Sequence, residues 1–103
     1  MKKIPAAIAV LTLLAVPAVP VMADGASVYK AKCALCHGEN GSGDTKMGKK
    51  LGLKDLRSPE MKKKSDQEIV KVITDGKDKM PAFKSKLSTR EILEVTKFVK
   101  GLK

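Results

Sequence analysis

The chain has 103 residues, which predicts a single domain, and its formal net charge of +10 makes it strongly basic. Its aromatic content, one Tyr and two Phe with no Trp, leaves little bulk for an ordinary core. The charge favours acidic partners. No nucleic-acid-binding motif accompanies it, so nucleic acid is not expected as a partner.

Residues 1–23 have the features of a secretory signal peptide. Two lysines precede an apolar stretch over residues 4–16, and small residues stand directly before and three positions before Asp24. Together with residues 17–23 the apolar run is about long enough to cross a bilayer, but prolines interrupt it, so cleavage before Asp24 is favoured over a retained membrane anchor. We expect an exported, periplasmic protein without membrane insertion, whose mature domain is residues 24–103.

A first helix is expected to begin after Asp24, whose carboxylate can cap it. Val28 and Tyr29 lie on this helix and lead to residues 33–37, which read Cys-Ala-Leu-Cys-His. Two thiols three positions apart, followed at once by an imidazole, form the attachment pattern of a c-type haem.

The chemistry of haem attachment needs this order of side chains. Each thiol adds to one vinyl group of the porphyrin, and a short helical stretch holds the two sulfurs at the two vinyl positions. The neutral imidazole that follows can bind iron. The pattern therefore predicts one haem c, covalently attached through Cys33 and Cys36, with His37 as an iron ligand. Because a covalently held porphyrin would supply the missing apolar bulk, we expect the apo chain to be largely unfolded.

Three alternatives to haem attachment fit the residues less well. A thioredoxin-like redox pair expects an adjoining βαβ pattern. A zinc site needs four ligands, whereas the chain contains two Cys and one His in all. A structural disulfide gives no role to His37.

The residues after the motif are expected to be loop and connection. Residues 38–44 are glycine-rich but lack the Gly-Lys-Ser/Thr ending of a phosphate-binding loop. Residues 47–56 form a basic, weakly apolar connection, and Ser58-Pro59 marks a turn or a helix start. The leucines of the connection can cover one edge of a haem: Leu51, Leu53 and Leu56.

Two capping boxes, Ser65 with Glu68 and Ser88 with Glu91, predict two further helices. The first ends at Gly76. Apolar residues recur at helical intervals along both. They are Ile69, Val72 and Ile73 in the first, and Ile92, Val95, Val99 and Leu102 in the second.

An iron bound by His37 has an opposite face, for which the chain offers no second histidine. Outside the leader the thioethers are Met47, Met61 and Met80. Met80 lies between the two capped helices, and Pro81 restricts it to an extended backbone and stiffens the loop. We predict Met80 as the second axial ligand, with Met61 as cover for the ring edge and Met47 in a basic segment near the motif.

This ligand pair predicts a one-electron carrier and not an enzyme, with no catalytic residues. A thioether favours ferrous iron, and two filled axial positions leave no open site for oxygen or peroxide. Two alternatives stay open. Either Met80 dissociates and the haem acts as a peroxidase or gas-binding site, or the chain is a haem subunit permanently associated with an oxidase or reductase.

With residues 33–37, the run Met-Pro-Ala-Phe at 80–83 and this order of helices, the chain resembles the small monohaem class I c-type cytochromes of bacteria. It is similar to the soluble carriers of photosynthetic and respiratory chains. The resemblance implies an all-α cytochrome c fold, with about four short helices wrapped around one covalently attached haem. It also implies that the first and last helices cross, with Gly25, Tyr29 and Phe98 at the crossing.

The family often has a Gly-Pro pair whose carbonyl accepts a hydrogen bond from the proximal imidazole. Here neither Gly48 nor Gly52 precedes a proline, so the sequence does not indicate the partner of His37. The expected partners are larger redox proteins or membrane redox complexes with acidic docking surfaces, approached by a monomer. Lysines near the haem edge are expected to guide docking: Lys46, Lys49, Lys77, Lys79 and Lys84.

Overall fold

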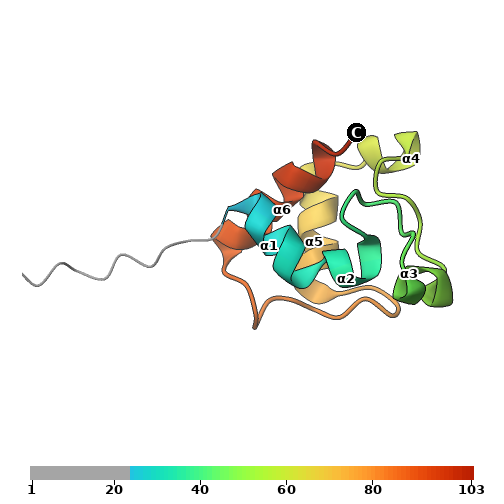
Figure 1. Cartoon of the computed structure of the whole chain (residues 1–103). Helices are drawn as coiled ribbons and strands as arrows, with labels where there is room; N and C mark the ends of the chain where they lie inside the picture. Colours follow the sequence, from blue (N-terminus) through green and yellow to red (C-terminus); the bar gives the residue numbers. More distant parts are fainter. Residues whose placement is uncertain (1–23) are drawn as a thin grey trace, which may run out of the picture.

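The computed structural model describes residues 24–103, so the predicted signal peptide at residues 1–23 lies outside the described part. Within that part the only β pairing is an isolated bridge between Lys77 and Met80, and Figure 1 shows helices joined by loops. The all-α prediction is confirmed. No helix of residues 24–103 has the length and apolarity that a membrane crossing requires. The helices are α1 (Gly25–Lys32), α2 (Ala34–His37), α3 (Lys46–Leu51), α4 (Pro59–Lys62), α5 (Asp66–Asp75) and α6 (Thr89–Lys100).

The three helix starts predicted from capping residues, those of α1, α5 and α6, each have a side-chain cap. The Asp24 carboxylate accepts a hydrogen bond from the Ser27 amide at 2.8 Å and begins α1. Ser88 and Glu91 form the full reciprocal box at the start of α6, and the Ser65 hydroxyl caps α5. Each such cap stabilises its helix by about 1 kcal/mol, because it satisfies an amide that the helix leaves unpaired.

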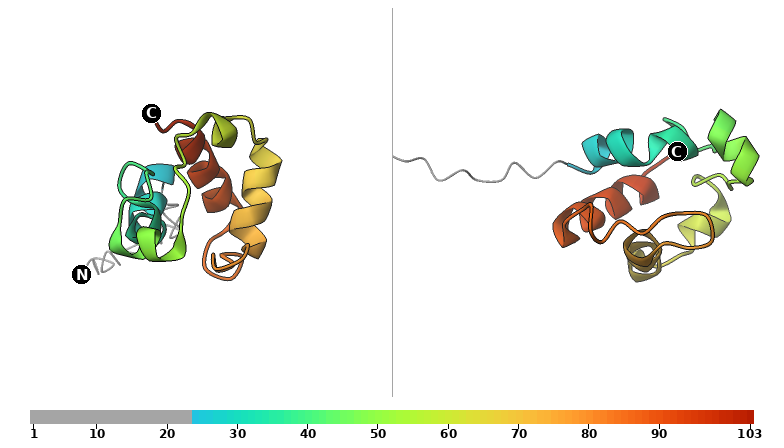
Figure 2. Two further views of the ribbon diagram at one scale, coloured as in Figure 1. Left: turned by 90° about the vertical axis from the view of Figure 1, so that its right-hand side faces the viewer. Right: turned by 90° about the horizontal axis from the view of Figure 1, so that it is seen from below.

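Helices α1 and α6 cross in close contact, as the family resemblance implies. Gly25 makes the approach possible, because a Cβ at this position would lie 2.2 Å from the carbonyl oxygen of Glu94. One turn further on, the rings of Tyr29 and Phe98 lie 5.0 Å apart between centroids. The views of Figure 2 agree in placing the two helices side by side.

The core lies where α5 packs against the other face of α6. Val95 in the middle of α6 is completely buried, and Thr96 beside it donates its hydroxyl hydrogen to the carbonyl of Ile92. By contrast, α2, α3 and α4 contain no buried apolar side chain. The buried apolar residues are Val28, Tyr29, Ile69, Ile73, Phe83, Leu87, Ile92, Val95 and Val99.

The stretch expected to be a plain connection contains a helix, α3. Thr45 begins it by accepting from the Gly48 amide at 2.8 Å, and Gly52 ends it in the left-handed conformation with φ of 68°. The Thr45 hydroxyl also donates to the carbonyl of Cys36 at 2.6 Å. The lysine-rich segment has no apolar stripe, so its helix depends on the caps and on this contact with the cysteine motif.

Candidate haem-binding site

The cysteine motif occupies the junction of α1 and α2. Cys33 ends α1 and begins α2, and its carbonyl accepts from the His37 amide at 2.9 Å. Gly38 ends the turn with φ of 85°, and its amide bonds to the carbonyl of Ala34. The expected short helical stretch between Cys33 and Cys36 is therefore present, with His37 on its last position.

Two neighbouring cavities bring the predicted site residues together. The first, about 170 Å³, is lined by Cys33, His37 and Met80, by Tyr29, and by apolar side chains of α5 and α6. The second, about 90 Å³, is again lined by Cys33, His37 and Met80 and adds Cys36. All four residues singled out from the sequence thus share walls of adjoining cavities, although they come from the α1–α2 junction, from α2 and from a loop far along the chain.

The Met80 loop is tightly held. Lys77 and Met80 exchange backbone hydrogen bonds of 3.1 and 2.9 Å across the turn, and the Phe83 amide bonds to the carbonyl of Ile73 in α5. Gly76 starts the loop with φ of 78°, and a Cβ there would lie 2.7 Å from the Met80 carbonyl oxygen. The loop therefore presents Met80 from a fixed backbone.

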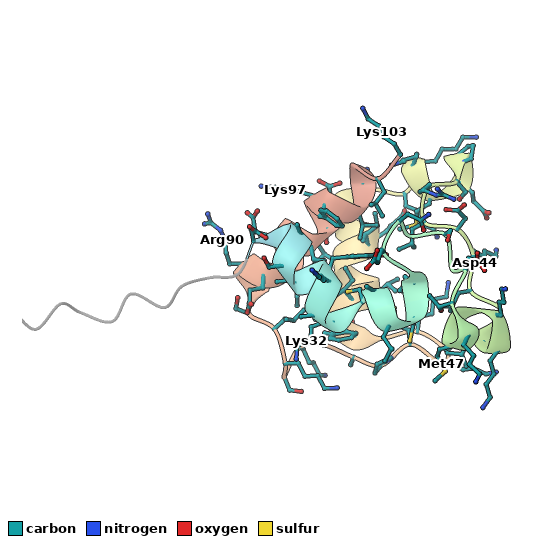
Figure 3. The ribbon with its side chains drawn as sticks, in the orientation of Figure 1. Lys32, Asp44, Met47, Arg90, Lys97 and Lys103 are labelled. Atoms are coloured by element: carbon teal, nitrogen blue, oxygen red, sulfur yellow. The ribbon has the colours of Figure 1, made fainter. Side chains whose placement is uncertain are left out.

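The three candidate methionines occupy different places. Met61, on α4, also lines the larger cavity, in keeping with its expected role as cover. Met47 is 41% exposed, and Figure 3 shows it on α3 at the outer edge of the molecule. It lines an outer groove and neither of the two cavities that His37 and Met80 share.

Burial sets the protonation of the site. It lowers the pKa of His37, so the imidazole is neutral at pH 7 and has a lone pair to donate. Its Nδ1 is buried and has no hydrogen-bond partner within residues 24–103, which agrees with the missing Gly-Pro pair. Burial, with the nearby Cys36 sulfur adding to it, raises the pKa of the Cys33 thiol to about 11.

This donor set fits a haem. A neutral imidazole nitrogen and a soft thioether are an iron-ligand pair found in cytochromes c, and the two thiols stand at the attachment spacing. The walls around them are apolar, as a porphyrin face requires. Among the described residues no cluster of His, Cys, Asp and Glu offers a competing metal site.

The family resemblance predicted Tyr29 at the helix crossing, but the role of its hydroxyl group was not predicted. The hydroxyl donates to the carbonyl of Gly38 at 2.6 Å and so ties α1 to the residue after His37. Burial, with a smaller contribution from Cys33, raises the pKa of Tyr29 to about 12. A tyrosine in place of a phenylalanine in an apolar core indicates that its hydroxyl group has a hydrogen-bond partner, and this was the signal in the sequence.

An exposed apolar patch lies on the outside of the motif. Leu35, between the two cysteines, is 80% exposed, and Met47 stands near it on the same groove. Lys46 and Lys50 also line this groove, and no acidic residue of the described chain does.

Of the five lysines named from the sequence, Lys49 is paired with Asp44 at 3.0 Å. Lys77 and Lys79 line the cavities of the site, whereas Lys84 is exposed and lines neither these cavities nor the groove, so the structure does not bring it to the predicted haem edge.

A family profile described as cytochrome c oxidase, cbb3-type, subunit III matches residues 20–99. The chain belongs to the cytochrome c family. It is 34% identical to cytochrome c6 of Anabaena variabilis over 83 residues, which is 76% of this chain and 87% of that protein. The solved c-type cytochrome KustC0563 superimposes with a TM-score of 0.73 at 34% identity, covering 79% of this chain and 99% of that one.

A third relative is much longer. The chain is 38% identical over 85 residues to the cbb3-type cytochrome c oxidase subunit FixP of Azorhizobium caulinodans, covering 81% of this chain but 28% of that subunit. At the level of the family, the predictions of a small c-type cytochrome with one haem c, the cytochrome c fold and an electron-transfer role without enzymatic activity are confirmed.

Proposed function

We propose that this protein is an exported one-electron carrier in which Cys33 and Cys36 would hold one haem c and His37 and Met80 would be the ligands of its iron. The observation that carries the proposal is that His37 and Met80, 43 positions apart in sequence, line the same two cavities together with Cys33. When bound, the haem supplies an iron that gains and loses a single electron.

The residues of the chain set the conditions for that exchange. His37 is kept neutral by burial and donates a nitrogen lone pair. Met80 offers a soft sulfur that favours the ferrous state. If both residues hold the iron, oxygen and peroxide would find no open position on it. Apolar walls from α5 and α6 would keep water away from the bound group.

The same proposal includes export and the way partners approach. Cleavage of residues 1–23 would release residues 24–103 into the periplasm as a monomer, with a formal charge of +8 once Lys2 and Lys3 are removed. The partners are larger redox proteins or membrane complexes with acidic docking surfaces. We place the contact on the exposed Leu35–Met47 patch with Lys46 and Lys50, because it lies directly outside the cysteine motif.

A second candidate is a haem subunit kept bound to an oxidase or reductase. The match to the cbb3-type profile and to part of FixP favours it. The two candidates differ in the fate of the leader. N-terminal sequencing of protein from a periplasmic fraction should give Asp24 first for a free carrier, whereas an intact leader in the membrane fraction would support the bound subunit.

Carbon monoxide separates a carrier from an open-site haem protein. We expect the Soret band of the reduced wild type to be unchanged under carbon monoxide. The Met80→Ala variant, whose iron would have a free position, should show a new band and serves as the positive control. Carbon monoxide binding by the wild type would contradict six-coordinate electron transfer.

The docking patch can be tested with ferricyanide, an anionic one-electron oxidant. Oxidation of the ferrous protein should slow as salt rises, because salt screens the attraction between opposite charges. The double change Lys46→Gln and Lys50→Gln should slow it at low salt. The matched double change Lys71→Gln and Lys84→Gln removes the same charge elsewhere. Equal rates for the two pairs would contradict the placement of the patch.

A further inference from the structure

We propose that Lys64 and Lys77 are the anchors of the haem propionates. The proposal rests on the proposed function, since it needs a haem in the cavity. A haem carries two carboxylates on one edge, and the remainder of its ring is apolar. The cavity must therefore provide cations or hydrogen-bond donors for two carboxylates along the edge where it meets solvent.

The composition of the larger cavity leaves few groups for this task. Apart from Cys33, His37 and Tyr29, its only polar lining residues in the described chain are Lys64 and Lys77. No carboxylate, arginine or amide side chain lines it. The Tyr29 hydroxyl already donates its hydrogen to the Gly38 carbonyl. A carboxylate left unpaired in such a wall would be costly, so the two ammonium groups are the partners that this cavity offers. Lys32 and Lys79 line the smaller cavity instead.

The two lysines also stand at the right depth. A wider cleft of about 440 Å³ shares His37 and Met80 with the larger cavity and opens outward between α3 and the Met80 loop. Lys64 and Lys77 line both spaces, whereas Lys54 and Lys79 line the cleft but not the larger cavity. They therefore mark the boundary between the apolar interior and the solvent, where the polar edge of a haem belongs.

The surroundings leave both side chains available. Lys64 directly precedes Ser65, which caps the start of α5, and Lys77 directly follows Gly76, which caps its end, so the two lysines approach the cavity from opposite ends of this helix. Neither has a salt-bridge partner within residues 24–103. The backbone at Lys64 is fixed, since its carbonyl accepts from Lys100 Nζ at 2.8 Å. The acidic groups of the outer cleft are Glu60, which pairs with Lys54, and Asp78.

The test compares Lys64→Gln and Lys77→Gln with Lys71→Gln and Lys84→Gln in the purified holoprotein. The control lysines are exposed and line none of these spaces, and each change removes one positive charge. We expect the midpoint potential to fall further in the first pair, because loss of a cation at the haem favours ferric iron. The propionate bending bands in the resonance Raman spectrum should shift in the first pair only. Lys64→Arg and Lys77→Arg should keep both properties close to wild type.

Each outcome decides. A lowered potential with shifted propionate bands supports the anchors. A lowered potential with unchanged bands would overturn them, since the lysines would then act only through their general field. Midpoint potentials and propionate bands equal to those of the control variants would also overturn the anchors. The carrier function would then still stand if the protein has covalent haem and does not bind carbon monoxide. A purified chain without covalent haem would remove the proposed function itself, and this proposal with it.

Discussion

Two regions of the molecule are built on different principles. Helices α1, α5 and α6 form a frame in which apolar side chains meet one another, as at Val95 and Ile69. Residues 38–64, with α3 and α4 (Figure 1), form a wall that contains no buried apolar side chain. The wall is held by backbone contacts, such as the Leu56 amide with the Gly41 carbonyl at 2.8 Å.

The difference shows what the haem does for the fold. The frame buries part of its apolar surface between its own helices, at about 25 cal/mol per Å², and leaves the side chains of α5 and α6 that line the larger cavity for the haem. The wall turns its leucines and Met61 toward the cavities and so depends on a ring to pack against. A small domain with few aromatic residues thus divides its stability between protein packing and a cofactor.

Loss of the haem attachment should have the largest effect. We expect the double change Cys33→Ala and Cys36→Ala to give a protein without covalent haem and largely unfolded, because the wall loses its packing partner. Far-UV circular dichroism would record the loss of helix. Leu35→Ala, in the same motif but exposed, should keep haem and helix and serves as the control. Native-like helix content in the haem-free double variant would contradict the account.

The second largest loss of stability is expected from a change at the crossing of α1 and α6. Gly25→Ala places a Cβ 2.2 Å from the Glu94 carbonyl oxygen, so α1 and α6 must move apart. We expect a loss of about 2–3 kcal/mol in the free energy of unfolding by denaturant. Gly101→Ala is the control, since a Cβ there finds its nearest atoms at 3.5 Å. A cost of the same size at both glycines would show that the close approach is not what matters.

The link between wall and frame should matter somewhat less. Lys62 of α4 donates to the carbonyl of Lys100 at 2.6 Å and to that of Leu102, at the end of α6. Lys62→Met removes both bonds to a helix C-terminus, and we expect a loss of about 1–2 kcal/mol. The neighbouring, exposed Lys63→Met should change the unfolding free energy by less than about 0.5 kcal/mol. Equal effects would mean that α4 is not tied to α6 by this side chain.

The smallest effect is a pH dependence from Tyr29. Burial raises its pKa to about 12, so the folded protein keeps a proton that the unfolded chain releases near pH 10. The resulting stabilisation is complete below pH 10 and is lost as the pH rises toward 12. Tyr29→Phe should cost about 1 kcal/mol at pH 7, from its lost hydrogen bond.

The comparison of the two proteins across pH isolates this tyrosine from the titrating lysines. The advantage of the wild type over Tyr29→Phe, measured in the holoprotein, should shrink between pH 10 and 12. Working with the holoprotein also removes the contribution of the Cys33 sulfur, whose charge a thioether abolishes. A constant difference over this range would show that the phenol is not held protonated by the fold.

The frame was largely predictable from the sequence. Asp24, Ser65 and Ser88 mark helix starts by a local rule, and the apolar spacing of residues 92–102 identifies the buried face of α6 without any tertiary information. The crossing at Gly25 followed from a family resemblance. The structure places both in agreement with those expectations.

The wall was less predictable for a physical reason. Helix α3 has no apolar periodicity, and its cap residue Thr45 is fixed by a bond to the distant Cys36 carbonyl, which no local pattern encodes. The contrast between Met80 and Met47 was indicated by Pro81 and by loop position. The nearness of Met61 to the same cavity, and of Lys64 and Lys77 to its mouth, depends on how loops fold over α5 and became visible only in three dimensions.

The most direct measurement is the absorption of the oxidised holoprotein in the weak band at about 700 nm that reports an iron–methionine bond. The wild type should show this band. Met80→Ala should lose it, whereas Met61→Ala, which changes a methionine on the wall of the same cavity, should keep it. A band that survives Met80→Ala, or a wild type with covalent haem and no band, would contradict the His37–Met80 ligand pair on which the proposed function rests.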